Sequence, residues 1–326
     1  MAKGTLAVLF PSRGILQPSA YEALAAGKTL AGPLGEPLDA AIIAGSKGAE
    51  FAKDVAARGP GRVHLIENPA FENFSDEAYA APLKRLIEKE GYARVVVVST
   101  INGRLLAARL SAALNAGIAA DVWGLAAEGG RVTAKRSVYG GNLIGEFAFG
   151  SERQVMLIQP LSFERAQPQG SPGQVVTADS APGAVRARFV SFEPQPAGEI
   201  DLGSAERVVS GGRGLGSADG FKMIRELAQV LGAAVGASRA VVDSGWIPYR
   251  HQVGLTGRTV RPKLYVACGI SGQIQHLAGM SSAANIVAIN TDPDCPMMKM
   301  ASIAVPGDVN EIIPPLIAEL KKRKGA

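Results

Sequence analysis

The sequence predicts an α/β protein with two domains. An N-terminal α/β domain with added β-strands is expected over residues 1–195, and a C-terminal domain with a parallel, Rossmann-like sheet over residues 196–326. Two observations lead to this prediction. Short apolar runs alternate with helix-like stretches in both halves, which is the pattern of a parallel sheet covered on both faces by helices. In addition, 326 residues are more than a typical single domain contains.

The first half of the chain supplies the elements of the N-terminal domain. Its continuous apolar runs predict strands, and the amphipathic stretches between them predict helices. In the third of these stretches, Tyr79, Leu83 and Leu86 recur at helical spacing while Lys84 and Arg85 face outward. The expected strands are 6–10, 40–44, 63–66 and 95–99, and the expected helices are 21–30, 49–58, 76–90 and 104–116.

From about residue 120 the pattern changes to strands joined by glycine-rich turns. The segment 167–183 is rich in Pro, Gly, Ser and Gln, which is typical of a loop, and the proline-punctuated stretch 193–196 predicts the domain boundary. The added strands are expected at 132–139, 144–149 and 155–160, with a further extended stretch at 186–192.

The remaining residues repeat the alternation of strand and helix. Asp308 and Glu311 have the spacing of an N-capping pair at the start of the last helix. Pro314 and Pro315 are expected to interrupt or kink that helix, because proline removes an amide donor and clashes with the preceding turn. The expected strands are 207–210, 240–243, 264–268, 286–290 and 303–305, and the expected helices are 217–231, 273–280 and the segment from 308 onward.

Composition excludes several classes of function. The net charge of +5 comes from scattered residues, and the one basic run, 321–324, is typical of a solvated helix end, so no nucleic acid partner is expected. Cys268 and Cys295 stand outside metal-binding spacings, and two buried, reduced thiols are expected. The apolar run 5–10 is too short for a signal peptide, and no stretch is long enough to span a bilayer, so we expect a soluble cytoplasmic protein.

Unusual residues follow the strands of the second half, where open parallel sheets bind ligands. The turn 210–216 is rich in glycine and contains Arg213; it suits a phosphate or is simply structural, and it lacks the G-x-G-x-x-G fingerprint. Arg239 stands among apolar residues, either beside an anionic or aromatic partner or as an exposed, ion-paired side chain. Thr256 lies in a polar loop, where it either donates a hydrogen bond to a ligand or caps the turn.

The segment 269–276, GISGQIQH, gives the sharpest prediction. A buried strand, a Gly/Ser turn and a helix N-terminus together make an anion site, because free amides and the helix dipole point at the ligand. His276 is then either a satisfied core residue or a ligand. Asn290 and Asp308 end later strands, where they serve as turn and cap residues or bind ribose hydroxyls. No nucleophilic triad, carboxylate pair or metal cluster stands out, so the cofactor is expected to carry redox chemistry.

These residues resemble the α subunit of electron-transfer flavoprotein. The resemblance covers about residues 211 to 308, and the N-terminal half fits the family only in outline. The matching blocks, in family order and spacing, are GGRGL (211–215), GASRA (236–240), VGLTG (253–257), LYVACGISGQIQHLAGM (264–280) and IVAINTDP (286–293).

The resemblance implies FAD and a role for each position. Arg213, Ser238 and the turn Ser271-Gly272 would lie along the ribityl-pyrophosphate. Arg239 and His276 would flank the isoalloxazine, where positive charge or hydrogen-bond donors favour the reduced flavin. Thr256 would bond near the flavin edge that exchanges electrons, and Asn290 and Asp308 would hold the adenosine end. The full set implied is Arg213, Ser238, Arg239, Val253, Gly254, Leu255, Thr256, Ser271, Gly272, Gln273, Ile274, Gln275, His276, Asn290, Asp308 and Val309.

The sequence departs from the family pattern at two positions: Leu255 stands where glutamine is usual, and Gln273 replaces a small residue. Both substitutions are expected to tune the redox potential of the flavin.

The family works as a heterodimer with a β subunit that carries AMP or a second flavin. It passes electrons from flavin dehydrogenases, such as acyl-CoA dehydrogenases, to a membrane quinone reductase. The expectation is therefore a redox carrier rather than a stand-alone enzyme. Two alternatives stay open at this point. One is the α subunit of an NADH-oxidising, electron-bifurcating complex, and the other is a non-redox nucleotide-binding or structural subunit.

Overall fold

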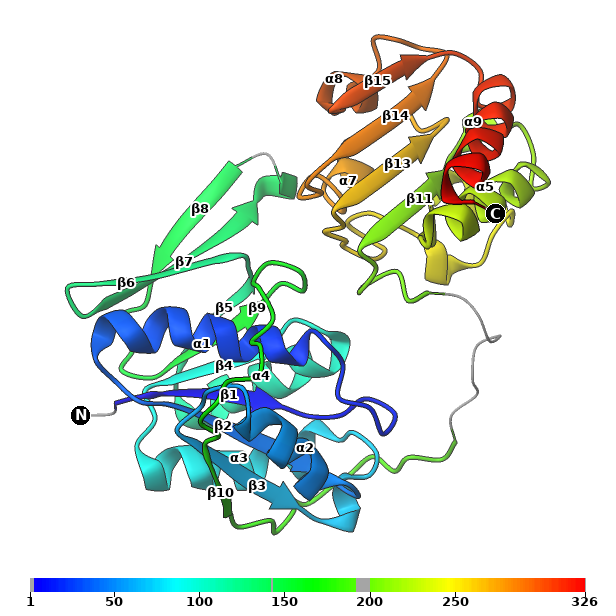
Figure 1. The fold of residues 1–326 in the computed structure, drawn as a ribbon. Coiled ribbons are helices and arrows are strands. Elements are labelled where there is room, and N and C mark those ends of the chain that lie inside the picture. Colours follow the sequence, from blue (N-terminus) through cyan, green and yellow to red (C-terminus); the bar gives the residue numbers. More distant parts are fainter. Residues whose placement is uncertain (1–2, 142, 192–199, 326) are drawn as a thin grey trace. The chain divides into compact units, whose positions relative to one another are not determined.

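A computed structural model describes residues 3–141, 143–191 and 200–325 (Figure 1). The chain divides into two compact units, Met1–Ser137 with Ile144–Phe192 (unit 1) and Val138–Leu143 with Glu193–Ala326 (unit 2). Each unit has its own sheet and its own core. The expected boundary between residues 195 and 196, and the stretch 193–196 that suggested it, lie outside the described residues, so that boundary stays a prediction.

Unit 1 is built on a seven-stranded sheet whose neighbouring strands all pair in parallel. The strands predicted from apolar runs are confirmed, and their side chains are buried almost throughout because helices cover both faces. Along the sheet the order is β10 (Gln174–Thr177), β3 (Arg62–Glu67), β2 (Leu38–Ala44), β1 (Thr5–Leu9), β4 (Arg94–Val98), β9 (Gln154–Ile158) and β5 (Gly117–Val122).

Four helices cover this sheet, two on each face. Residues of α3 (Asp76–Glu90) and α4 (Ile101–Leu114) pack in one core, and residues of α1 (Ala20–Leu34) and α2 (Gly48–Ala56) pack in the other. Ser75 and Thr100 cap α3 and α4 by accepting hydrogen bonds from the amides of Ala78 and Gly103. The four helices predicted in this half are therefore confirmed.

A small second sheet has the order β6 (Gly124–Glu128), β7 (Arg131–Val138) and β8 (Leu143–Ala148), and it holds two of the added strands, those expected at 132–139 and 144–149. The third, expected at 155–160, is β9 of the seven-stranded sheet. The predicted loop 167–183 is wrong in part, because β10 lies inside it and pairs with β3. The extended stretch 186–192 is also wrong over its described residues, which form no strand. Val190 is 80% exposed there, so its apolar character does not mark a sheet position.

Unit 2 is a five-stranded parallel sheet, and its strand order corresponds to the doubly wound arrangement 2-1-3-4-5. Helices α5 (Gly220–Leu231) and α9 (Val309–Lys324) pack on one face, and the other face carries a core with Met280 and Met297. The strands in spatial order are β12 (Ala234–Ala237), β11 (Arg207–Gly211), β13 (Leu264–Cys268), β14 (Ile286–Asn290) and β15 (Ile303–Pro306).

Three predictions for unit 2 need correction. The expected strand 240–243 is the helix α6 (Arg239–Asp243), and the strand is the preceding β12. The helix expected at 273–280 is the single turn α7 (Ile274–Leu277). Pro314 and Pro315 do not interrupt α9, whose first turns expose Asn310 and Glu311 so that water can solvate their carbonyl groups. The capping role of Asp308 is confirmed, since its side chain accepts from the amide of Asn310.

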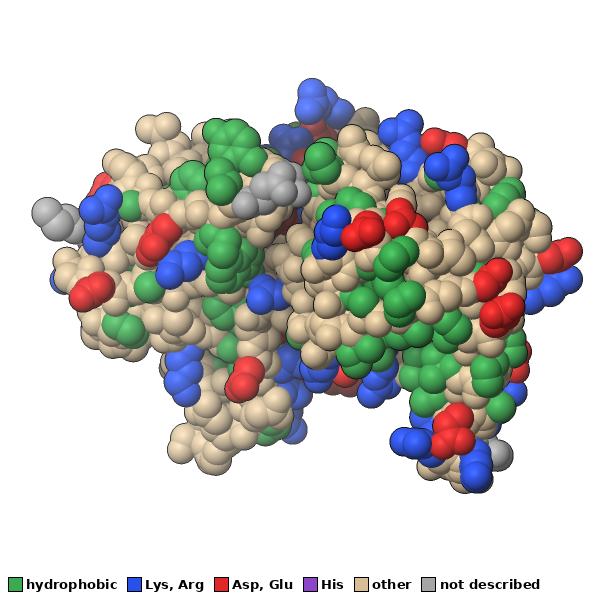
Figure 2. All heavy atoms as spheres, turned by 90° about the horizontal axis from the view of Figure 1, so that it is seen from above, with side chains coloured by type: hydrophobic (Ala, Val, Ile, Leu, Met, Phe, Trp, Pro, Cys, Tyr) green, Lys and Arg blue, Asp and Glu red, His purple; other side chains and the backbone are tan. Residues whose placement is uncertain are grey.

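Charges on the surface are mixed, as the composition predicted. On the face seen in Figure 2, Lys and Arg side chains are interspersed with Asp and Glu. Both cysteines are buried and free. Among the helices that the structure describes, none is both long enough and apolar enough to cross a membrane.

Candidate functional site

The candidate site lies at the carboxyl edge of the unit 2 sheet. There β11 and β13 are neighbours (Figure 1), whereas β12, which lies between them in the sequence, pairs on the far side of β11. The connections from these strands leave in opposite directions along the sheet, and doubly wound sheets bind ligands beyond the strand ends at such a point. The predicted residues from the two turns, Arg213 and Ser271, therefore belong to one region of unit 2.

The two turns touch through their glycines. The amide of Gly212 donates to the carbonyl oxygen of Cys268 at 2.9 Å, and the amide of Gly214 donates to that of Gly269 at 3.0 Å. A Cβ atom on Gly212 would lie 2.4 Å from the Gly269 oxygen, and Gly269 has φ +63°. These glycines are thus required by the packing of one turn on the other, whatever the turns bind.

Exposed polar groups line these turns. The side chain of Arg213 is exposed and forms no ion pair or hydrogen bond within the described parts of the chain. Ser271 is exposed as well, and its carbonyl oxygen accepts from the amide of Met297 at 3.1 Å. At Gly272, φ is +84° and a Cβ atom would lie 2.5 Å from the Met297 nitrogen, so only glycine fits. An unpaired guanidinium beside such a turn suits a phosphate group.

The loop 252–257 forms backbone hydrogen bonds with both β12 and α7. The amide of Val253 donates to the carbonyl oxygen of Ala237 at 2.9 Å, and the amide of Leu255 donates to that of Gln275 at 2.7 Å. Gly254 has φ +143° and lies against Gln275 and His276. The structure therefore brings the loop together with the end of β12, where Ser238 follows, and with the helix that carries His276.

Gln252, in this loop, and Tyr249, just before it, both contact Thr256. The side-chain Nε2 of Gln252 donates to the Thr256 hydroxyl oxygen at 3.0 Å, and the Tyr249 hydroxyl donates to the Thr256 carbonyl oxygen. Because the Thr256 oxygen accepts from Gln252, its own proton is free to be donated outward. The sequence analysis did not select either of these supporting residues. The available signal was a glutamine, Gln252, directly before Val253 and Gly254; in the structure Gln252 is 2% exposed.

Arg239 adopts the exposed, ion-paired alternative. Its Nε lies 3.1 Å from Oδ2 of Asp243, and the two side chains are 64% and 60% exposed. Ser238 caps α6 by position, but its side chain makes no capping hydrogen bond. Both side chains are thus accessible for a ligand at the end of β12.

His276 is buried and neutral. Its Nε2 lies 2.9 Å from the hydroxyl of Tyr265. Burial lowers the pKa of His276 to about 4, and the backbone of Val253 opposes this only in part. Of the two contributions expected from this residue, a hydrogen-bond donor fits the structure and a standing positive charge does not.

The other predicted residues divide by exposure. Leu255, Gln273, Ile274 and Gln275 are exposed. Asn290 bridges within the fold, since its Nδ2 donates to the Ile270 carbonyl oxygen at 3.0 Å and its Oδ1 accepts from the amide of Asp292 at 3.1 Å. The side chain of Val309 is 2% exposed and belongs to the core under α9, so only its backbone is available to a ligand.

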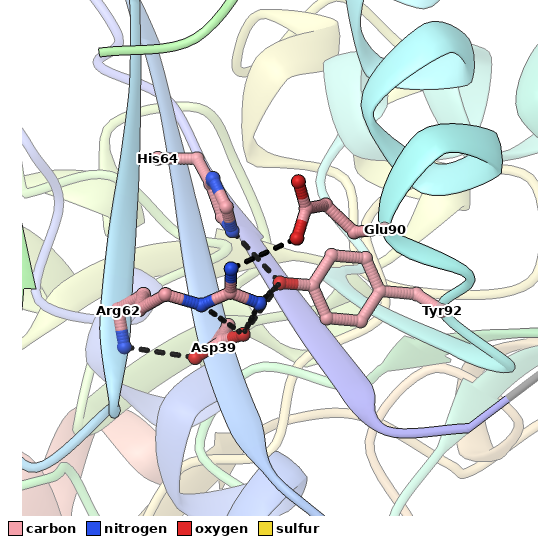
Figure 3. Close-up of polar contacts among 5 residues, drawn as sticks. All are labelled: Asp39, Arg62, His64, Glu90 and Tyr92. Atoms are coloured by element: carbon pink, nitrogen blue, oxygen red, sulfur yellow. Dashed lines mark hydrogen bonds and ion pairs between the residues drawn. The ribbon is translucent and has the colours of Figure 1, made fainter. Parts of the chain in front are cut away.

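A second buried polar cluster lies in unit 1 (Figure 3). Asp39 accepts from Arg62 at 2.8 Å and from the hydroxyl of Tyr92 at 2.5 Å, and that hydroxyl also lies 2.8 Å from Nε2 of His64. Glu90 pairs with the other side of Arg62 at 2.8 Å. These residues stand at the amino ends of strands, away from the edge where parallel sheets bind ligands, so the cluster stabilises the fold.

The fold and the site define a class: a two-unit α/β protein whose doubly wound sheet carries glycine-rich turns and exposed polar side chains at its carboxyl edge. The electron transfer flavoprotein domain matches residues 5–182, and the electron transfer flavoprotein FAD-binding domain matches residues 201–281. The chain belongs to the electron transfer flavoprotein family, on the side of the alpha subunits.

Individual relatives agree with the two domain matches. An electron transfer flavoprotein subunit alpha of Thermoanaerobacterium thermosaccharolyticum is 41% identical over 316 residues, which cover 95% of this chain and 96% of the relative. Protein FixB of Clostridium saccharobutylicum is 35% identical over 325 residues, covering 98% and 97%. The subunit alpha of Bacillus subtilis is 34% identical over 310 residues, covering 95% and 94%. The likeness thus extends over both units.

Proposed function

We propose that the chain is the α subunit of a heterodimeric electron-transfer flavoprotein that holds FAD in unit 2. In this proposal it carries electrons from flavin dehydrogenases, such as acyl-CoA dehydrogenases, to a quinone reductase. The observation that carries the proposal is the pair of turns after β11 and β13, which meet at the carboxyl edge of the sheet and place the exposed, unpaired side chain of Arg213 beside a turn with exposed Ser271. FAD, when bound, supplies one- and two-electron transfer.

The donor set at this edge of the sheet suits the pyrophosphate of FAD. Arg213 supplies charge, Ser238 supplies a hydroxyl group that is not used as a cap, and the turn at Ser271 and Gly272 supplies polar groups beside a close backbone approach. The side chains of Arg213 and Ser271 are exposed, and neither has to break an ion pair to meet a phosphate.

The loop 252–257 suits the isoalloxazine end. Thr256 directs a free hydroxyl proton outward, which fits a heteroatom of the ring. Arg239 supplies a positive charge that Asp243 partly neutralises, and charge near the ring favours its reduced form. His276 contributes through hydrogen bonding, because it is neutral.

Asn290 and Asp308 remain the proposed contacts for the adenosine end. Asp308 uses Oδ1 to cap α9, which leaves its second carboxylate oxygen for a ribose hydroxyl. Asn290 keeps one amide proton and one oxygen lone pair beyond its two internal hydrogen bonds. Val309 would contribute its backbone amide next to Asp308.

The partner in this proposal is the β subunit, with unit 1 contributing to the heterodimer and the β subunit carrying AMP or a second flavin. The test is to produce the two subunits together and to identify the nucleotide released from the purified complex. The expected result is stoichiometric FAD. An acyl-CoA dehydrogenase with its substrate should bleach this FAD, and NADH alone should leave it unchanged under anaerobic conditions. Bleaching by NADH alone would replace the carrier by a bifurcating complex. A colourless complex that takes up no added FAD would indicate a non-redox subunit.

A further inference from the structure

The chain contains two buried tyrosine–histidine pairs of nearly equal geometry. In unit 1, the hydroxyl of Tyr92 lies 2.8 Å from Nε2 of His64; in unit 2, the hydroxyl of Tyr265 lies 2.9 Å from Nε2 of His276. The ring centroids are 6.0 and 6.1 Å apart, and the rings meet edge to face. The distances alone do not say which partner donates, so the surroundings have to decide.

In the pair of unit 1, a carboxylate takes the tyrosine proton (Figure 3). The Tyr92 hydroxyl donates to Oδ2 of Asp39 at 2.5 Å. A hydroxyl has one proton, so the bond to His64 must be donated by the imidazole. His64 therefore carries its proton on Nε2, and burial, together with the nearby Arg62, lowers its pKa and keeps it neutral.

In the pair of unit 2, no described carboxylate contacts the tyrosine. The hydroxyl of Tyr265 has Nε2 of His276 as its hydrogen-bond partner. The side-chain oxygen of Ser210 is buried and has no hydrogen-bond partner among the described residues, so it does not take the Tyr265 proton. The Tyr265 proton therefore goes to Nε2 of His276.

The protonation states support this direction. Burial raises the pKa of Tyr265, so the phenol keeps its proton at neutral pH. The titratable groups near the pair are the two partners themselves and the thiol of Cys268, whose pKa burial also raises. Neutral His276 has one ring proton, and with Nε2 acting as acceptor that proton must be on Nδ1.

We propose that Tyr265 is a positioning residue that fixes His276 as the neutral Nδ1–H tautomer, the opposite of the Nε2–H tautomer of His64. The consequence for the cofactor site rests on the proposed function. His276 is then a neutral ring whose single proton is on Nδ1, a buried atom without a hydrogen-bond partner among the described residues, and the ring lies near the backbone of Val253. Positive charge at the flavin is left to the arginines, Arg213 and Arg239.

The test is nitrogen-15 NMR of the full chain, freed of cofactor and labelled at its three histidines. Long-range proton–nitrogen correlations distinguish a protonated from an unprotonated ring nitrogen. His276→Gln identifies the signals of His276. In the wild type, His276 is expected with Nδ1 protonated and His64 with Nε2 protonated. A His276 protonated on Nε2, or on both nitrogens at neutral pH, would overturn the proposal without any further variant.

The variant Tyr265→Phe keeps the ring and removes the donor. It is expected to release His276 into a mixture of tautomers and to leave His64 unchanged. Tyr92→Phe is the matched control, since it removes the hydroxyl of the other pair and should move only the His64 signals. An unchanged His276 spectrum in Tyr265→Phe would contradict the role of Tyr265.

These outcomes are separate from those of the proposed function, because the NMR measurement contains no cofactor. A chain that shows the Nδ1–H tautomer but never retains FAD would remove the proposed function and keep the tautomer. A chain that retains FAD with His276 protonated on Nε2 would keep the proposed function and remove the proposed tautomer. In FAD-loaded protein, a midpoint potential that shifts in Tyr265→Phe and stays constant in Tyr92→Phe would tie the tautomer to the flavin.

Discussion

The backbone amide of Leu255 donates to the carbonyl oxygen of Gln275 at 2.7 Å, and this bond joins the loop 252–257 to α7. The two segments also meet at glycines, because a Cβ atom on Gly279 would lie 2.4 Å from both N and Cα of Gly254. Thr256 and His276, which sit on the two joined segments, are therefore held by one piece of backbone. A change that pushes the segments apart displaces both residues together.

Gly279→Ala tests this junction. The added methyl group has to move backbone rather than a flexible side chain, so we expect a loss of about 1–3 kcal/mol in the free energy of unfolding of unit 2. FAD retention should fall with it. Trp246 lies in unit 2 and reports its unfolding by fluorescence. Gly150→Ala is the control, since nothing lies within 4 Å of its Cβ position. Equal behaviour of the two variants would mean that the junction tolerates a side chain.

Arg213→Gln tests the phosphate role of the unpaired arginine. Hydrogen bonds to charged groups contribute about 1.5–3 kcal/mol, so FAD affinity should fall about tenfold or more. The affinity of the wild type should also depend more steeply on ionic strength. Equilibrium dialysis of FAD at several salt concentrations measures both effects. Arg323→Gln removes an exposed arginine that pairs with Glu319 on α9, and it should change neither. Equal affinities and salt slopes would exclude Arg213 from the site.

Arg239 and Asp243 should tune the flavin in opposite directions. Arg239→Ala removes a cation and is expected to lower the midpoint potential, whereas Asp243→Asn frees the cation and should raise it. Because both side chains are exposed, each shift should be no more than about 20 mV. Redox titration of the FAD-loaded heterodimer measures the two shifts. Shifts of the same sign, or none, would argue against Arg239 lying beside the isoalloxazine.

Much of the site was predictable because it depends on local sequence. Glycines that meet across turns, such as Gly212 and Gly269, and polar residues at strand ends leave a pattern that single segments display. The direction of a buried side chain leaves no such pattern. The sequence around Tyr265 is that of an ordinary buried strand, and only the tertiary structure reveals the contact of Tyr265 with His276, eleven positions away. For the same reason, the neutral state of His276 followed from its burial and not from the motif.

The fold was predictable where the pattern was clear, as in the continuous apolar run of β4 and the amphipathic spacing of α3. The strand β12 was missed because its sequence, AVGA, is short and made of small residues, while the apolar run after Arg239 belongs to α6. The strand β10 was missed because it lies in a segment rich in glycine and proline, and it is a strand only through its pairing with β3.

Asp39→Asn should destabilise unit 1. Asp39 is 2% exposed and accepts from Arg62 and Tyr92, so removal of its charge leaves these donors poorly paired. We expect a loss of about 3 kcal/mol in the free energy of unfolding. Denaturant unfolding followed by the fluorescence of Trp123, which lies in unit 1, measures the loss. Glu88→Gln breaks an exposed pair with Lys84 and should cost at most about 1 kcal/mol. Similar losses in the two variants would contradict the importance of the buried cluster.

Glu22 makes the stability of unit 1 depend on pH. Its side chain is 1% exposed, and burial raises its pKa from 4.5 to about 7, while the backbone of Leu161 and the charge of Arg165 oppose the effect. The pKa in the folded state is above that in the unfolded state. The contribution of Glu22 to stability is therefore complete below about pH 4.5 and is lost as the pH rises through about 7.

Glu22→Gln removes this titration and keeps the shape of the side chain. Above pH 7 the variant should be more stable than the wild type by up to about 3 kcal/mol, and near pH 4 the two should be equally stable. Denaturant unfolding followed at Trp123 across this pH range gives the difference directly. Glu50→Gln is the control, because it removes an exposed glutamate from the first turn of α2, just as Glu22 lies in the first turn of α1. A Glu22→Gln variant whose advantage is the same at every pH would show that Glu22 does not titrate in this range.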